Sequence, residues 1–363
     1  MQEYFHTPDN YFMSHSVGCL PRRTQTDLNT EFFKSWEDGQ NWTKWMPVLD
    51  KFRTGVANIL GAEQSEICPQ INISSALTKI LYSLPEPTTK NIILLSEEDF
   101  PTIGFVFEQA KKRGYLLRFV DGNPSDIDNW EKALDHNVAI VHATHALSNT
   151  SHLLPVKEIC QRAKEYEAIS IIDIAQSAGV VPIDVKAWGC DFAIGTGVKF
   201  LCFGPGACFL YVASSQMTKT QPLDVGWFSH ENPFEMDIHN FKYAKDAMRF
   251  FGGTPSPAPF VMANSAMAVW GEIGLEAVHS LIQKNLIAIT DAVPPRFLKS
   301  PLEPAQRGGT VVITPKQREA LRESFAQHAI QHDERKEGFR CSVHGYTSED
   351  DIATLKQALN SAF

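Results

Sequence analysis

The chain has 363 residues, with 43% hydrophobic and 21% charged side chains, values that are ordinary for a globular protein and argue against global disorder. Its formal net charge is -9 and it carries no basic stripe, so we expect no nucleic-acid partner. The N-terminal residues do not follow the pattern of a signal peptide, and no apolar run approaches the roughly 20 residues that span a membrane. We therefore expect a cytoplasmic protein without a membrane partner.

The middle of the chain alternates β-rich runs with helical periodicity. Strands are expected at 91–100, 115–120, 138–145, 169–179, 190–196 and 207–213. Helices are expected at 102–114, at 125–135 with Ser125 as its cap, and at 155–167 with Pro155 at its start. The first four strands are continuous apolar runs, as expected when helices cover both faces of a sheet. This pattern predicts the α/β class, with a doubly wound, mostly parallel sheet sandwiched by helices.

The last third of the chain has a different order of elements. A long helical stretch over 261–290 leads to a break at 291–309, and the expected elements that follow are a strand at 310–313, a helix at 316–330, a strand at 338–345 and a helix from 348. This order predicts a smaller α+β C-terminal domain. We expect three regions: an N-terminal segment (1–45) that joins the small domain and a dimer seam, a large cofactor-binding domain (46–280) and a small domain (281–363).

The seven cysteines support neither a disulfide framework nor a zinc site. They are scattered along the chain and include no CxxC pair: Cys19, Cys68, Cys160, Cys190, Cys202, Cys208 and Cys341. His142 and His145 stand three apart on one expected strand and so point to opposite faces, which makes a poor metal pair. We therefore expect no metal, and each cysteine is best explained as a small buried hydrophobe.

Candidate site residues, most of them polar, lie at or after the ends of several expected strands, where a parallel sheet delivers its carboxyl ends to one crevice. They are Phe100, Thr144, His145, Asp173, Thr196 and Lys199. A buried aspartate is costly unless a charge meets it, although a lone Asp173 is equally explained as a structural cap. Lys199 stands between two glycine clusters in the apolar run "DFAIGTGVKFLCFGPGACFLYV", and taken alone it would be a lysine that reaches solvent along an apolar stem.

Taken together, these residues favour pyridoxal phosphate. That cofactor needs a lysine for a Schiff base, an acid for its pyridine nitrogen, and small hydroxyl and glycine groups for its phosphate. Thr196 and Gly197 directly before Lys199 offer a hydroxyl and a close backbone approach. Ser74 and Ser75 open an expected helix at 72–81, where free amides attract an anion. The glycines in "FGPGA" lack the GxGxxG spacing of a dinucleotide site and are expected to shape a tight turn.

At these residues the sequence resembles the class V aminotransferase group of fold-type I pyridoxal phosphate enzymes. The similar stretch is "HALSNTSHLLPVKEI…IIDIAQSAGVVPIDVKAWGCDFAIGTGVKFLCFGPGACFLYV". Within the group, "YFMSHSVGCLP", "DFPTIGF", "DVGWFSHENPFEMD", "MRFFGGTPSPAP" and "GFRCSVHGYTSEDDI" are similar to kynureninases. The resemblance implies an enzyme that acts on an α-amino acid, with kynureninase-like lyase or hydrolase chemistry at a C–C or C–X bond.

The resemblance also implies roles for individual residues. Lys199 would form the Schiff base and carry the Cα proton, Asp173 would pair with the pyridine nitrogen, Phe100 would stack on the ring, and Gln176 would approach the ring oxygen. Phosphate ligands would be Ser74, Ser75 and Thr196, and Thr144 belongs to the same cofactor site. Arg340 would bind the substrate carboxylate, with Asn149 in the substrate site. Trp227 and Thr254 match positions that reach the phosphate from the neighbouring subunit, which implies a homodimer.

The departures from the kynureninase pattern keep alternatives open. Val198 stands where kynureninases have a tyrosine, Gln176 where they have a histidine, Asn149 near a tyrosine position and Ile103 where they have an acid. Glutamine at 176 is usual in class V aminotransferases and desulfurases. The alternatives are thus a class V aminotransferase, a cysteine desulfurase-like lyase or a catalytically retired cofactor-binding protein. A group of tryptophans, Trp36, Trp42 and Trp45, is expected to line an entrance or to pack at a dimer seam.

Overall fold

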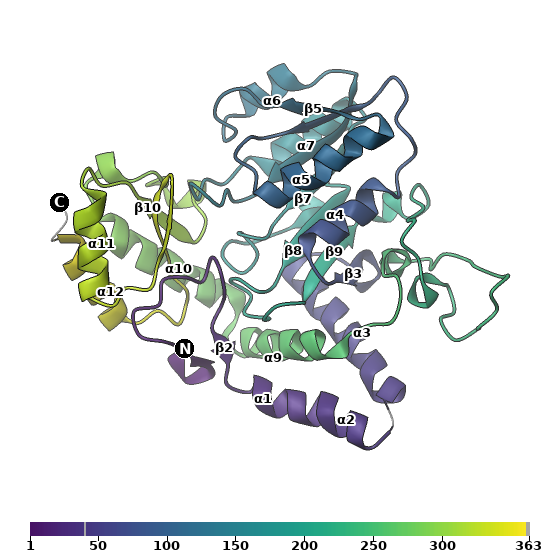
Figure 1. The fold of residues 1–363 in the computed structure, drawn as a ribbon, viewed down its shortest axis with the longest axis horizontal. Coiled ribbons are helices and arrows are strands. Elements are labelled where there is room, and N and C mark those ends of the chain that lie inside the picture. The colour runs from purple at the N-terminus through teal and green to yellow at the C-terminus, as the bar shows by residue number, and fades with distance from the viewer. Residues whose placement is uncertain (40, 361–363) are drawn as a thin grey trace.

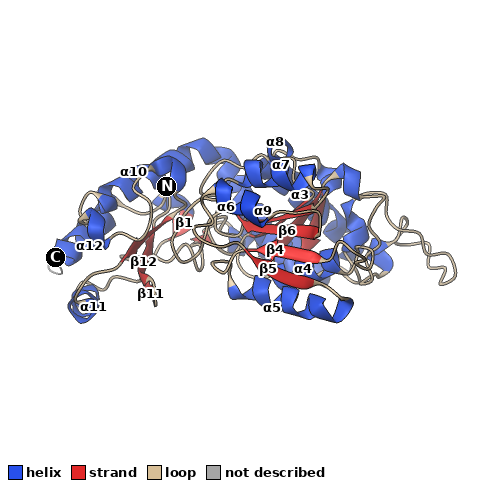
Figure 2. Ribbon diagram, turned by 90° about the horizontal axis from the view of Figure 1, so that it is seen from above, coloured by secondary structure: helices blue, strands red, loops and turns tan. Residues whose placement is uncertain are grey.

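A sheet of seven strands forms the centre of the larger part of the protein. Figure 2 colours all strands red, and those of this sheet lie between two layers of helices. The computed structural model describes residues 1–39 and 41–360. In spatial order the strands are β3 (Ile67–Gln70), β9 (Cys208–Val212), β8 (Phe192–Thr196), β7 (Ile169–Asp173), β6 (Val138–Thr144), β4 (Ile92–Leu95) and β5 (Leu116–Phe119). Strands β4 to β8 are mutually parallel, and β9 runs antiparallel to both of its neighbours. The predicted mostly parallel sheet is confirmed.

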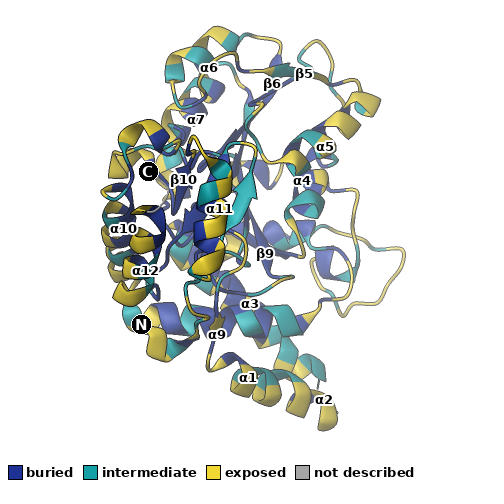
Figure 3. Ribbon diagram, turned by 60° about the vertical axis from the view of Figure 1, so that its left-hand side comes forward, coloured by how far each residue is buried: buried dark blue, intermediate teal, exposed yellow. Residues whose placement is uncertain are grey.

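Helices cover both faces of this sheet, because successive side chains of its strands alternate between two hydrophobic cores. One face packs against α4 (Ile73–Leu81) and α5 (Pro101–Ala110). The other face packs against α3 (Asn41–Leu60), α6 (Ile127–Ala133), α7 (Val156–Glu165), α8 (Val185–Trp188) and α9 (Pro257–Ile273). Figure 3 shows the buried strands enclosed by helices with exposed outer surfaces.

The smaller part contains a three-stranded antiparallel sheet in the order β10 (Thr310–Ile313), β12 (Gly338–Ser342) and β11 (Asp333–Arg335). Its helices are α10 (Leu275–Thr290), α11 (Arg318–Gln327) and α12 (Glu349–Asn360). The predicted α+β C-terminal region is therefore present, at the left of Figure 1. The boundaries near residues 45 and 280 stay a prediction.

The N-terminal segment links the two parts. Its strands β1 (Phe5–His6) and β2 (Leu20–Pro21) pair with each other, and α1 (Thr24–Asp27) and α2 (Lys34–Glu37) follow through one π-helical stretch. Between the strands, Met13 forms a bridge with Ser342 of the small sheet. The amide of Gly18 donates to the carbonyl oxygen of Val198 in the large part at 2.8 Å. The segment thus contacts both parts next to Lys199.

Several local details differ from the sequence-based expectations. The cap of α6 is Asp126, whose carboxylate accepts from the amide of Asp128, so the expected cap at Ser125 is wrong. The long C-terminal helix is broken at Gly274, which has φ +83°, a conformation that favours glycine. Strand β3 was not expected. No helix within 1–39 and 41–360 is long and apolar enough to cross a lipid bilayer.

Candidate active site

Three neighbouring strands end in polar residues on the same face of the large sheet. Thr144 ends β6 and lies opposite Asp173, which ends β7. Thr196 ends β8, and Lys199 follows three residues later. The face is the one covered by α4 and α5, whose first residues follow β3 and β4 at the same edge. The parallel sheet therefore brings both helix N-termini and these polar side chains to one crevice, as the sequence analysis predicted.

A cavity of about 410 Å³ lies at this edge. It is lined by seven of the predicted site residues: Ser74, Phe100, Thr144, Asp173, Gln176, Thr196 and Lys199. The other predicted residues do not line it: Ser75, Asn149, Trp227, Thr254 and Arg340. The cavity is large enough for a small cofactor with a substrate beside it, which is the size range of ordinary ligand pockets.

Asp173 is almost completely buried in the cavity wall. Burial raises the pKa of its carboxyl. A hydrogen bond of 2.7 Å from the Ala175 amide to Oδ1 and the electrostatic interactions with His142 and Lys199 lower it. A buried carboxylate gains most from a cation or a strong donor that meets it. A protonated ring nitrogen in the cavity is such a group.

Lys199 presents its amine beside the aromatic ring of Phe100. Nζ lies 5.7 Å from the ring centroid. Burial lowers the pKa of Lys199 to about 8; Asp173 opposes this shift, and the nearby Arg340 and Arg335 add to it. A lysine with such a pKa is partly neutral near neutral pH and is therefore able to act as a nucleophile or a base.

The glycines around Lys199 serve packing and turning. A Cβ at Gly197 would lie 1.9 Å from the ring of Phe203, so the small residue is required by that ring. This gives a packing reason for Gly197, where a close approach to phosphate was expected. Gly204 and Gly206 have φ of +75° and +88°, which confirms the predicted tight turn after the lysine.

The N-terminus of α4 offers donors for an anion. Its cap is Asn72, whose Oδ1 accepts from the Ser74 hydroxyl and from the Ser75 amide, each at 2.8 Å, so the expected opening of the helix by its serines is wrong. The amides of Ile73 and Ser74 have no acceptor among residues 1–39 and 41–360, and both residues line the cavity. Free amides at a helix start, with the Ser74 and Thr196 hydroxyls, fit the phosphate group of pyridoxal phosphate.

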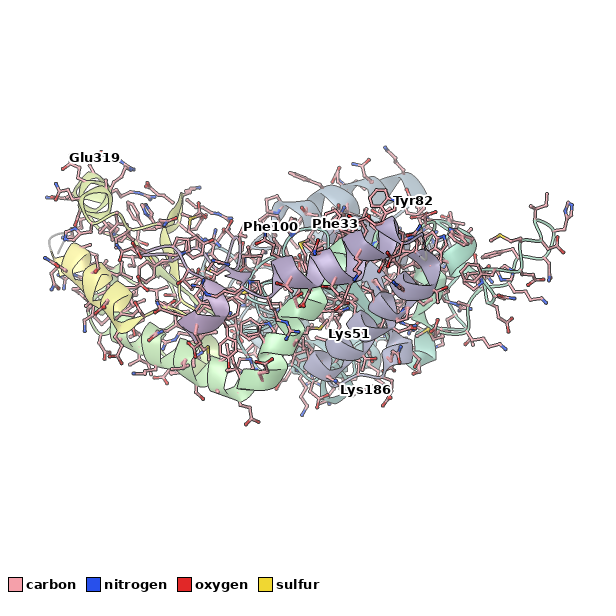
Figure 4. All side chains as sticks on the ribbon, turned by 90° about the horizontal axis from the view of Figure 1, so that it is seen from below. Phe33, Lys51, Tyr82, Phe100, Lys186 and Glu319 are labelled. Carbon is pink, nitrogen blue, oxygen red and sulfur yellow. The ribbon has the colours of Figure 1, made fainter. Side chains whose placement is uncertain are left out.

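Two arginines of the small sheet stand near this cavity and share one carboxylate. Arg340 is 1% exposed, which excludes the alternative of a surface residue, and its Nη1 donates to Asp333 Oδ2 at 2.5 Å. Burial lowers the pKa of Arg340 to about 10. Arg335 donates from Nη1 to Asn149 Oδ1 at 2.9 Å, and its Cζ lies 5.9 Å from the Phe100 centroid. Phe100 lies at the side of the large part that faces the small sheet (Figure 4).

Sequence reasoning missed Arg335, Asp333 and His15. His15 is buried, its carbonyl oxygen accepts from Gln176 Nε2 at 3.2 Å, and its Nδ1 lies 2.8 Å from Ser342 Oγ. These three residues gather only after the N-terminal segment and the β11–β12 hairpin have folded together. A usable signal was the charged run "HDERKEGFR", in which Arg335 precedes Arg340 by five positions.

Trp227 and Thr254 lie together away from the cavity. Trp227 Nε1 donates to Thr254 Oγ1 at 3.2 Å. Trp42 packs edge-on against Trp227 at 5.4 Å and against Trp45 at 5.8 Å, and Trp45 lies 6.5 Å from Trp36. The predicted tryptophan group and the predicted partner-site residues therefore form one continuous aromatic cluster.

The remaining polar candidates do not add a nucleophile or a metal site. All seven cysteines are buried, and burial raises the pKa of every one of their thiols, so none presents a thiolate. His142 pairs with Asp99, whereas His145 packs on Trp188 from the opposite face. No group of three or more His, Cys, Asp or Glu residues within the described ranges is placed to hold a metal ion.

The chain is similar to curated kynureninases. The enzyme of Deinococcus radiodurans is 29% identical over 317 residues, covering 83% of this chain and 76% of the relative. That of Pseudomonas fluorescens is 25% identical over 337 residues, covering 86% and 79%. A kynureninase of Burkholderia mallei is 27% identical over 308 residues, covering 80% and 72%.

Solved structures share the fold. A variant of the lyase C-DES with glycine covalently linked to its PLP cofactor has 19% identity, full coverage of both chains and a TM-score of 0.88. The apo cysteine desulfurase of Thermococcus onnurineus NA1 has 19% identity, covers 97% of this chain and 94% of that one, and has a TM-score of 0.84. The family pattern described as "Aminotransferase class-V" matches residues 39–319. The chain therefore belongs to the class V aminotransferase family.

Proposed function

We propose that the protein is a pyridoxal phosphate-dependent enzyme that acts on an α-amino acid with kynureninase-like chemistry, cleaving the bond between the β and γ carbons. The observation that carries this proposal is the cavity in which Lys199, Asp173 and Phe100 meet the free amides of α4. The similarity to three kynureninases over most of the chain supports the reaction class. A structural neighbour holds the same cofactor.

Bound pyridoxal phosphate supplies an electron sink for negative charge that develops on the substrate's Cα. Asp173 would accept a hydrogen bond from the ring nitrogen and would hold the proton there, because a cation beside it favours the ionised form of this buried carboxyl. Ser74, Thr196 and the first amides of α4 would bind the phosphate. Phe100, which lines the cavity, would stack on the ring.

Lys199 moves the proton. Its amine would hold the cofactor and, as a base of lowered pKa, would take the proton from the substrate's Cα at Nζ and return it. Arg340 binds the α-carboxylate of the substrate by a paired, charge-assisted contact. In the structure the guanidinium of Arg340 donates a hydrogen bond to the carboxylate of Asp333, so the substrate carboxylate competes with Asp333 for Arg340.

We extend the proposal to a homodimer with shared sites. Trp227 and Thr254 do not line the cavity of their own chain, and the segment 223–241, which contains Trp227, exposes large apolar side chains, among them Leu223 at 70% and Ile238 at 88%. Water-exposed apolar groups of this size are normally covered by a partner. The tryptophan cluster lies at the same place and would pack at the seam. We also propose a cytoplasmic location and a domain division near residues 45 and 280.

The test is turnover of L-kynurenine by the cofactor-loaded protein, with product analysis and a Lys199→Ala control. The proposal expects anthranilate and alanine without any added acceptor. A second candidate, transamination, is favoured by Val198 and Gln176, which line the cavity where kynureninases have a tyrosine and a histidine. Keto acid that forms only when an amino acceptor is supplied would support that candidate and refute cleavage.

A further inference from the structure

Arg335 is fixed at the edge of the cavity by the loop that follows β6. Its Nη1 donates to Asn149 Oδ1 at 2.9 Å and lies 3.4 Å from the hydroxyl of Ser148, which lines the cavity. On its other side, Nε donates to Asp333 Oδ2 at 3.2 Å. The guanidinium is thus held in one orientation by groups from both the large and the small part.

The charge of Arg335 is only partly neutralised. Asp333 Oδ2 also accepts the hydrogen bond from Arg340, so two guanidiniums share one carboxylate oxygen. The partners of Arg335 Nη1 are neutral oxygens, and Nη2 has no acceptor in the described part of the chain. A guanidinium has five N–H donors and no acceptor, so its free side is a site for an oxygen. The side chain is 33% exposed, so a ligand has access to it.

Arg335 and the reacting amine of Lys199 both lie near the ring of Phe100. The Cζ of Arg335 and the Nζ of Lys199 are each within 6 Å of the centroid of Phe100. Two other positions of this cavity at which the chain departs from the kynureninase pattern are apolar, because Val198 and Ile103 replace a tyrosine and an acid. Neither of these two side chains offers a hydrogen bond to a substrate side chain.

We propose that Arg335 determines substrate specificity by donating hydrogen bonds to an oxygen on the γ-carbon of the substrate. This inference rests on the proposed function and narrows it to α-amino acids with a γ-keto or γ-carboxylate group. Arg340 keeps the α-carboxylate, in competition with Asp333, and Arg335, whose side chain is the more exposed of the two, is left for the variable side chain. The γ-oxygen of such a substrate accepts a hydrogen bond from the free Nη2 of Arg335.

The test uses two ligands with the same carbon skeleton, L-aspartate and L-2-aminobutyrate, of which only aspartate has γ-oxygens, and it records binding directly after mixing, before any turnover. Their apparent Kd values are measured from the change in the cofactor absorbance of the loaded protein. A charge-assisted hydrogen bond predicts that the wild type binds aspartate about tenfold more tightly or better. Arg335→Met should reduce the ratio to within about twofold, and Arg335→Lys, which keeps the charge, should retain part of it.

The matched control is Arg322→Met, which removes another arginine that contacts the β11–β12 hairpin through Glu334 and has no hydrogen bond to Arg335 in the described part of the chain. It should leave the ratio unchanged. Arg340→Met should weaken both ligands to the same degree. Equal affinities in the wild type, or an equal loss of both ligands in Arg335→Met, would overturn the inference while leaving the proposed function standing. Protein that shows no cofactor absorbance at all would instead refute the proposed function.

Discussion

Gly18 lies directly on the backbone of Lys199. Its amide donates to Val198, and a Cβ at Gly18 would lie 2.1 Å from the Lys199 carbonyl oxygen and 2.6 Å from Cys202 Sγ. Gly18→Ala therefore forces the N-terminal segment away from the lysine loop. We expect a loss of about 1–3 kcal/mol in the free energy of unfolding, measured by thermal or urea denaturation. The same variant should bind pyridoxal phosphate more weakly.

The control for Gly18 is Gly271, which lies in α9 with no atom within 4 Å of an added Cβ. Gly271→Ala should raise the free energy of unfolding by about 0.5–1 kcal/mol, because alanine is the better helix former. Equal stability changes in the two variants would contradict the close packing of Gly18 against the lysine loop.

The depressed pKa of Lys199 predicts a pH dependence for cofactor attachment. Only the neutral amine attacks an aldehyde, and burial brings the pKa of Lys199 down to about 8. The rate at which the apo-protein takes up pyridoxal phosphate should rise through about pH 8 and then level off. Arg340→Met removes a cation that lowers this pKa, so its midpoint should move to higher pH. A midpoint near 10.5 in the wild type would refute the prediction.

His145 predicts a loss of stability in acid. Burial lowers the pKa of His145 to about 4, whereas an unfolded histidine titrates near 6.5. Between these values the unfolded chain binds more protons, so stability falls as the pH drops from 6.5 to 4. His145→Phe keeps a ring on Trp188 and should gain up to roughly 3 kcal/mol relative to the wild type between pH 7.5 and pH 4. Parallel stability curves for the two proteins would count against this account.

Mixing variants tests whether active sites are shared between subunits. Lys199→Ala and Trp227→Ala should each be nearly inactive alone. In a heterodimer, the chain with intact Lys199 receives Trp227 from its partner, which restores one complete site. Unfolding and refolding the two variants together should therefore recover activity that neither shows alone. If both residues serve the same chain, every site in the mixture lacks one of them and no activity returns.

The sequence was sufficient for six of the seven strands of the large sheet and for seven of the residues that line the cavity. Its central strands are continuous apolar runs, and polar residues at their carboxyl ends, such as Asp173, necessarily meet at one edge. Strand β3 was missed because "ICPQ" is short and contains a proline, which is tolerated there at the edge of the sheet. Asn72 was missed as a cap because two serines follow it closely.

The substrate side of the cavity could not be read in the same way. Arg335 and Arg340 are brought to Phe100 by the packing of the small sheet on the large part, and local sequence patterns do not encode that contact. His15 reaches Ser342 from the other end of the chain. Such groups depend on tertiary contacts between distant segments, which strand and helix periodicity does not report.

The central claim is that Lys199 binds pyridoxal phosphate covalently in the cavity that Asp173 and Phe100 line. The most direct measurement is borohydride reduction of the cofactor-loaded protein, followed by mass spectrometry of the peptide that contains residues 191–212. We predict that this peptide carries the reduced cofactor on Lys199, and that Lys199→Ala carries none. An unmodified Lys199 in protein saturated with pyridoxal phosphate would contradict the account.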